Sequence, residues 1–131
     1  MEKVLLILRG CPGSGKSSLA EALGIKAVCC ADDYFVHDGK YLWDNDKLYA
    51  AHCWCERKCR RFMKKQIAII VVANTFTSAR EFRPYEDLAR QFGYKLFSVV
   101  VENRHGGENS HGVSEETLEK FKNRLINNIK L

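Results

Sequence analysis

Residues 10–17 form the segment of this chain with the clearest chemical purpose. They read GCPGSGKS and match the pattern G-x-x-x-x-G-K-[ST] in full. Three glycines let the backbone take positive φ values and approach a ligand closely, so that successive N–H groups can converge on a phosphate. Lys16 would then reach the β- and γ-phosphates of a nucleotide such as ATP, and the Ser17 hydroxyl would ligate a bridging Mg²⁺ ion. The residues expected to contact the nucleotide are Gly10, Cys11, Pro12, Gly13, Ser14, Gly15, Lys16, Ser17 and Ser18.

Two neighbouring carboxylates offer a second chemical function. Asp32 and Asp33 follow the apolar segment 26–31. A carboxylate that faces the γ-phosphate could accept the proton of an acceptor hydroxyl, which is the role expected of Asp32. Asp33 could orient Mg²⁺ or its water molecules. The alternative is that one or both carboxylates only cap the turn that follows.

This chemistry requires elements that bring the two segments together, and the apolar pattern predicts them. Strand alternates with helix throughout, which is typical of a three-layer α/β fold with a mostly parallel central sheet and helices on both faces. The expected strands are 4–8, 26–31, 67–72 and 94–101, and the expected helices are 18–23, 44–65, 78–92 and 114–129. Ligands bind at the carboxyl ends of parallel strands. Residues 10–17, 32–33, 74–75 and 102–112 should therefore form one cleft.

Length and composition limit the remaining possibilities. The 131 residues have room for one domain, 1–131, with a substantial core. No run approaches about 18 apolar residues, and residues 1–3 lead directly into a strand, so we expect a soluble, cytoplasmic protein with neither a membrane span nor a signal peptide. The six cysteines include no C-x-x-C pair, which favours reduced thiols over zinc or disulfides.

The net charge of +5 is distributed unevenly. Residues 57–65 carry six cations within nine positions of one expected helix. Such a face suits an anionic partner, nucleic acid first. Equally, these cations could form a solvated helix end that complements the C-terminal helix dipole.

A polar, glycine-rich segment at about 102–113 follows the last expected strand and predicts a lid over the nucleotide. Arg104 is its only arginine. It could stabilise charge on a transferring phosphoryl group, or it could be an ordinary surface side chain. No N-K-x-D element, which a GTPase would use to recognise its base, follows a later strand.

Taken in order, these motifs resemble those of the P-loop polynucleotide 5′-hydroxyl kinases. The resemblance is greatest to the short ATP-binding kinase-like domain found in phage and bacterial proteins and in the family of a ubiquitin-ligase-binding protein. It spans nearly the whole chain. Besides the phosphate loop, the matching segments are DDYF at 32–35, AHCW at 51–54, Asn74-Thr75, Pro84-Tyr85, the arginine-bearing lid and His111-Gly112-Val113.

The resemblance implies transfer of the γ-phosphate of ATP to a 5′-hydroxyl end of RNA or DNA. Asp32 matches the general base of that family, Thr75 matches a residue near the acceptor, and Arg104 corresponds to a lid arginine. Two positions depart from the family pattern. Ala73 stands where many relatives carry an aspartate, and Glu108 stands where a relative would often have arginine.

Several other residues could bind a nucleic acid strand. Asn74, Arg80, Arg83 and Lys95 could contact the acceptor or its phosphates, and Tyr34, Phe35 or Trp43 could stack on a base. Each could instead be packing or solvated surface. Two alternatives stay open at this point: a P-loop kinase of a small metabolite or nucleoside, and a non-catalytic ATP-binding module.

Overall fold

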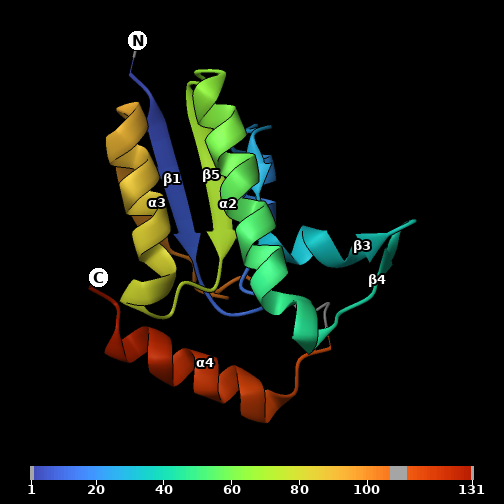
Figure 1. Ribbon diagram of the computed structural model, residues 1–131. Coiled ribbons are helices and arrows are strands. Elements are labelled where there is room, and N and C mark those ends of the chain that lie inside the picture. Colours follow the sequence, from blue (N-terminus) through green and yellow to red (C-terminus); the bar gives the residue numbers. More distant parts are fainter. Residues whose placement is uncertain (1, 107–111, 131) are drawn as a thin grey trace.

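The computed structural model describes residues 2–106 and 112–130. Its centre is a parallel sheet of four strands in the order β2-β5-β1-β6 (Figure 1). These strands are β1 (Val4–Arg9), β2 (Val28–Cys29), β5 (Ile69–Asn74) and β6 (Lys95–Val100). β1 pairs with β5 from Val4↔Ile69 to Arg9↔Asn74 and with β6 from Val4↔Lys95 to Arg9↔Val100. The shared register brings the carboxyl ends of three strands to one level.

The apolar runs form central strands because both faces of the sheet are covered there. On one face, Leu5 and Ile7 of β1 pack with α2 (Leu48–Lys64) and α3 (Ala79–Phe92). On the other face, Leu8 packs with Ala20 of α1 (Lys16–Ala22). Helices on both faces of a parallel sheet confirm the predicted three-layer α/β architecture.

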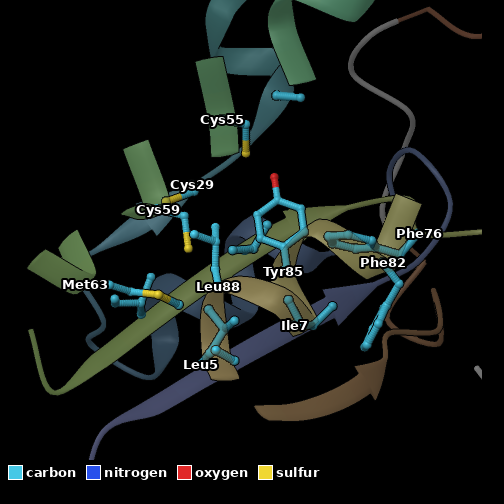
Figure 2. Packing of buried hydrophobic residues seen from close by; sticks show 14 of the residues in the cluster. Leu5, Ile7, Cys29, Cys55, Cys59, Met63, Phe76, Phe82, Tyr85 and Leu88 are labelled. Carbon is cyan, nitrogen blue, oxygen red and sulfur yellow. The ribbon is translucent and has the colours of Figure 1, made fainter. Parts of the chain in front are cut away.

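The main core lies between the sheet and the pair α2 and α3 (Figure 2). Tyr85 of α3 reaches across this layer toward the thiols of α2, and burial raises its pKa. Cys29 of β2 and Cys55 and Cys59 of α2 are buried there. All six cysteines are free thiols.

Local sequence signals explain the ends of the helices. Ser78 and Glu81 form a capping box at the start of α3, and Gly93, with φ 74°, ends this helix. The hydroxyl of Ser114 accepts a hydrogen bond from the Thr117 amide at 3.2 Å and caps α4 (Glu115–Asn127). Asp38 and Gly39 both have positive φ and form a tight turn. They join a short hairpin of β3 (Val36–His37) and β4 (Lys40–Tyr41).

Two elements are shorter than the apolar pattern indicates. The strand expected at 26–31 is only β2, because the chain enters a 3-10 helix, η1 (Ala31–Phe35), directly after it. The helix expected from 44 begins with a second 3-10 turn, η2 (Asn45–Lys47), and becomes α-helical only at Leu48. The carboxylate of Asp44 caps that turn by accepting from the Asp46 amide at 3.0 Å.

The last helix covers the carboxyl end of the sheet rather than one of its faces. In Figure 1, α4 crosses beneath the points where β1 and β5 end. Arg9, the last residue of β1, is only 1% exposed and fixes the end of this helix. Its Nη1 donates to the Ile129 carbonyl at 2.8 Å and its Nη2 to the Asn128 carbonyl at 2.7 Å. The same guanidinium donates from Nε to the Phe76 carbonyl at 3.0 Å, so one buried side chain ties β1, the chain after β5 and α4 together.

Within residues 2–106 and 112–130, no helix has the length and apolar character needed to cross a membrane.

Candidate active site at the carboxyl edge of the sheet

The phosphate loop joins β1 to α1, in the strand–loop–helix context that the motif requires. Gly13 and Gly15 adopt φ values of 80° and 103°, which side-chain-bearing residues rarely take. Gly10 is needed for space, because a Cβ there would lie 2.5 Å from the Ser14 Oγ and 2.7 Å from the Val101 carbonyl oxygen. The Ser14 hydroxyl is buried and has no hydrogen-bond partner among the described residues. This close-packed cradle, with a buried polar atom left over, fits a phosphate group.

Lys16 folds over this loop. Its Nζ donates to the carbonyls of Gly10 at 2.7 Å and Cys11 at 3.0 Å. Burial lowers the pKa of Lys16, and the nearby Cys30 and Asp32 oppose that shift. A phosphate bound in the loop would offer the ammonium group a better partner than these neutral carbonyls.

Asp32 lies on η1, directly after the carboxyl end of β2. The Tyr41 hydroxyl donates to its Oδ1 at 3.4 Å. Burial, together with the Asp32 charge, raises the pKa of Tyr41 to about 12, so the hydroxyl keeps its proton at neutral pH.

Asn74 holds this turn in place. Its Oδ1 accepts a hydrogen bond from the Ala31 amide at 2.9 Å, and its Nδ2 donates to the Cys55 Sγ at 3.7 Å. The sequence suggested Asn74 as a substrate contact. In the structure its side chain connects the end of β5 to η1 and thereby positions Asp32.

One cavity of about 530 Å³ brings the phosphate-loop lysine and the general-base candidate together. Five of the residues predicted as site residues line it: Pro12, Lys16, Asp32, Asn74 and Thr75. Ala73, the position where relatives carry an aspartate, is buried and lines it too. Three of the four segments predicted to form one cleft, 10–17, 32–33 and 74–75, therefore meet in this cavity; from the fourth, 102–112, only Gly112 lines it among the described residues.

Other predicted residues lie outside the lining of this cavity. Asp33 is exposed on η1, and Arg80 and Arg83 are exposed in the first turns of α3. Arg104 is exposed and forms an ion pair with Glu102. Ser17 and Ser18 are exposed on the first turn of α1. Of the expected lid, residues 107–111, which include Glu108 and His111, lie outside the described part of the chain.

The three aromatic candidates for stacking separate clearly. Phe35 is buried, and Tyr34 packs edge-on against Phe35 and Trp54. Trp43 alone of the three lines the cavity.

Sequence reasoning missed Tyr41, which donates to Asp32, and two further groups of site residues. The first is the wall that α4 contributes to the cavity, which comprises Thr117, Phe121 and Arg124. Nothing in the local sequence indicates that this helix crosses the cleft. The second is His105: a Cβ on Gly15 would lie 2.6 Å from its Cε1, so the neighbour of Arg104 is the residue that packs on the phosphate loop. His105 is one of two histidines in this polar loop, and no spacing or motif in the sequence singles it out.

Comparison with known proteins agrees with this geometry. The model of the family AAA_33, described as an AAA domain, matches residues 5–125. The chain belongs to this family. NEDD4-binding protein 2 of Homo sapiens is 34% identical over 131 residues, which cover 90% of this chain and 7% of that protein. This AAA_33 chain thus corresponds to a small part of that relative.

Solved structures show the same fold at low sequence identity. A chain of the Pnkp1/Rnl/Hen1 complex superposes with a TM-score of 0.62 and 20% identity, covering 91% of this chain and 38% of its own length. A candidate kinase of Chloroflexus aurantiacus gives a TM-score of 0.59 with 14% identity, covering 77% of this chain and 59% of its own length. The AAA_33 chain therefore has a P-loop kinase-like fold.

Proposed function

We propose that this protein is an ATP-dependent kinase that transfers the γ-phosphate to a 5′-hydroxyl of RNA or DNA. The observation that supports this proposal most directly is the shared cavity of Lys16 and Asp32. A phosphate-binding lysine after β1 and a half-buried carboxylate after β2 are two groups that phosphoryl transfer to a hydroxyl uses. The motifs that resemble polynucleotide 5′-hydroxyl kinases supply the nature of the acceptor.

In the proposed reaction, the loop amides and Lys16 bind the β- and γ-phosphates and hold them in place. Asp32 accepts the proton of the acceptor hydroxyl while the hydroxyl oxygen forms a bond to the γ-phosphorus. The bond between the γ-phosphorus and the β-phosphate oxygen breaks at the same time, and ADP leaves. Tyr41 orients the Asp32 carboxylate for this role. Ser17 and Asp33, both exposed near the loop and η1, would hold Mg²⁺, which would supply neutralisation of the phosphate charge. Arg104, Arg80 and Arg83 remain proposed contacts to phosphates of the donor or acceptor.

The cavity wall supports a nucleic acid acceptor over a small metabolite. Tyr41, Trp43 and Phe121 give it aromatic surface, and Arg124 adds a cation. A hydroxylated metabolite without a planar ring would leave this surface unused, whereas a nucleotide end offers both a π-face and a phosphate.

The test is transfer of labelled γ-phosphate from ATP to 5′-hydroxyl RNA and DNA oligonucleotides. We expect labelled product with the parent protein. Asp32→Asn should lower the rate of transfer by about 10²–10⁴-fold, the effect of losing a general base. Asp38→Asn is the matched control, because Asp38 sits at the exposed hairpin turn with φ 52°, a conformation that asparagine tolerates. For the lysine of the phosphate loop, Lys16→Met should likewise lose transfer, and Lys26→Met, which alters an exposed lysine, is its matched control. Label that persists in both Asp32→Asn and Lys16→Met would refute the assigned roles.

A non-catalytic ATP-binding module is the second candidate, and Ala73 is the observation that favours it. The cavity has no carboxylate at that strand end, so fewer groups are available to hold Mg²⁺ than in many relatives. This candidate predicts that the parent protein and Asp32→Asn bind ATP equally and that neither transfers phosphate to any 5′-hydroxyl end.

A further inference from the structure

We propose that the cavity binds the base of the acceptor's 5′-terminal nucleotide by stacking it between Trp43 and Phe121. This inference rests on the proposed function and specifies how that site recognises its substrate. Two aromatic side chains from elements far apart in the sequence line the same cavity as Lys16 and Asp32. A ligand that fills it would therefore meet the aromatic rings and the phosphoryl-transfer groups together.

Trp43 is a supported but open platform. It follows β4 and packs against buried Phe35, with ring centroids 6.3 Å apart at an interplanar angle of 45°. It nevertheless stays 51% exposed. A large indole that is backed by the core on one side and left open on the cavity side is poised to gain contact area from a flat ligand.

Phe121, the second aromatic residue, comes from α4 and lines the same cavity. The guanidinium of Arg124 lies 5.1 Å from the centroid of its ring, and Arg124 also lines the cavity. The side chain that stacks on Phe121 thus carries a positive charge at the same wall. A base stacked on this ring would have its own 3′-phosphate within the field of that cation, which is the pairing of stacking and charge found at single-stranded nucleic acid sites.

The position of the cavity assigns the base to the acceptor rather than to ATP. The aromatic wall adjoins the Asp32 and Tyr41 side of Lys16, where the acceptor hydroxyl must lie. His105 packs on the phosphate loop from the loop after β6, and that residue is outside the cavity lining. The donor base is therefore expected toward His105 and the acceptor base toward Trp43.

Fluorescence gives a direct test, because Trp43 and Trp54 are the two tryptophans of the chain. In Trp54→Phe, all tryptophan emission comes from Trp43. We expect a 5′-hydroxyl dinucleotide to quench this emission, and an otherwise identical dinucleotide with a base-free 5′ sugar to leave it unchanged at the same concentration. In Trp43→Phe, the dinucleotide should leave the emission of Trp54 unchanged. Equal quenching by ATP alone, or by the base-free analogue, would overturn the proposal.

Kinetics separate this inference from the proposed function. The parent protein should phosphorylate the base-bearing dinucleotide with a kcat/KM roughly tenfold or more above that of the base-free analogue, the scale of one base–aromatic stack. Phe121→Leu and Trp43→Ala should each bring the ratio of the two kcat/KM values, base-bearing over base-free, closer to one. Ile126→Ala, which alters an exposed residue of the same helix outside the cavity, should keep it. Equal rates on both acceptors with the parent protein would overturn the stacking site and leave the kinase standing. If neither acceptor is phosphorylated, the proposed function fails, and the quenching of Trp43 decides the stacking by itself.

Discussion

At the scale of single residues, the site depends on a few side chains that act on one another within the cavity. The Tyr41 hydroxyl holds the Asp32 carboxylate, and Asn74 holds the turn that carries it. Gly10 and Gly15 leave the room that the phosphate loop needs. Small changes at these positions should therefore alter function more than stability.

Removing the Tyr41 hydroxyl tests its positioning role. In Tyr41→Phe, we expect kcat to fall several-fold with the KM for ATP unchanged, because Asp32 loses the Tyr41 hydrogen bond while the phosphate loop stays intact. The raised pKa of Tyr41, about 12, keeps the phenol protonated. The ratio of the parent rate to the variant rate should thus stay constant from about pH 7 to about pH 10. It should fall toward one only at higher pH, where the Tyr41 phenol of the parent protein ionises. A ratio that collapses near neutral pH would contradict this role.

Gly10 and Gly24 form a matched pair for the loop. In Gly10→Ala, the new methyl group would meet the Val101 carbonyl at 2.7 Å, so we expect ATP binding to be lost and the protein to be destabilised by about 1–3 kcal/mol. Gly24→Ala meets no atom within 4 Å and should cost only the strain of its φ of 71°, roughly 1 kcal/mol, with ATP binding retained. Calorimetric titration with ATP and denaturant unfolding measure the two effects; equal loss of ATP binding in both variants would rule out the steric explanation.

At the scale of elements, α4 completes the cavity from outside the sheet. It has one buried side chain, Leu125, and its carboxyl end is fixed by the Arg9 guanidinium. Helices with so little buried surface depend on such specific contacts. Arg9 therefore links the last residue of β1 to the wall that presents Thr117, Phe121 and Arg124.

Substitution of Arg9 should release this helix. In Arg9→Met, we expect the free energy of unfolding to fall by about 1.5–3 kcal/mol for each charged hydrogen bond that is lost. This fall is partly offset because the replacement side chain is apolar. Amide hydrogen exchange should accelerate in α4 while α3 stays protected. Arg9→Lys keeps the charge but replaces the planar guanidinium with a single ammonium group. Its exchange rates in α4 should therefore lie between those of the parent protein and those of Arg9→Met. Unchanged exchange in α4 would show that other contacts hold it.

At the scale of the whole molecule, the basic segment and the cavity lie at opposite ends. α2 runs antiparallel to the strands, so its last turns lie near the start of β1, away from α4 (Figure 1). Its 17 residues span about 25 Å at 1.5 Å per residue. Two of its cations also pack on aromatic rings: Lys58 over Trp54 and Arg60 over Phe92. The cations of residues 57–65 therefore do not line the cavity.

Charge reversal at this remote end has a length-dependent outcome. We expect Arg61→Glu combined with Lys64→Glu and Lys65→Glu to leave phosphorylation of a dinucleotide unchanged. The nearest of these cations, Arg61, lies nine residues, or about 13.5 Å, along α2 from the cavity-lining His52, which exceeds the screening length of about 10 Å at 0.1 M salt. Only acceptors longer than roughly four nucleotides, at 3.4 Å each, could reach these cations, and the charge reversal should lower their affinity and its salt dependence. Steady-state rates across a length series at two salt concentrations measure this. A loss already present with the dinucleotide would contradict the separation of the two surfaces.

Local signals in the sequence were sufficient for much of the fold. The spacing in residues 10–17 is readable because its chemistry lies within eight consecutive residues. The runs that became β1 and β5 and the caps Ser78, Gly93 and Ser114 likewise depend on neighbours only a few positions away. Sequence therefore determined the α/β architecture, the phosphate loop and the nearness of Asp32 to it, since parallel strands must end at one edge.

Tertiary structure alone decided which residues complete the site. Arg9 meets carbonyls 119 and 120 positions away, and Asn74 meets an amide 43 positions away. Trp43 and Phe121 share a cavity only because α4 crosses the carboxyl edge instead of lying on the sheet. No local pattern encodes such contacts, because they depend on where whole elements pack. An arginine, an asparagine or an aromatic ring in one position of a sequence reads the same whether it is buried, bridging or open to a ligand.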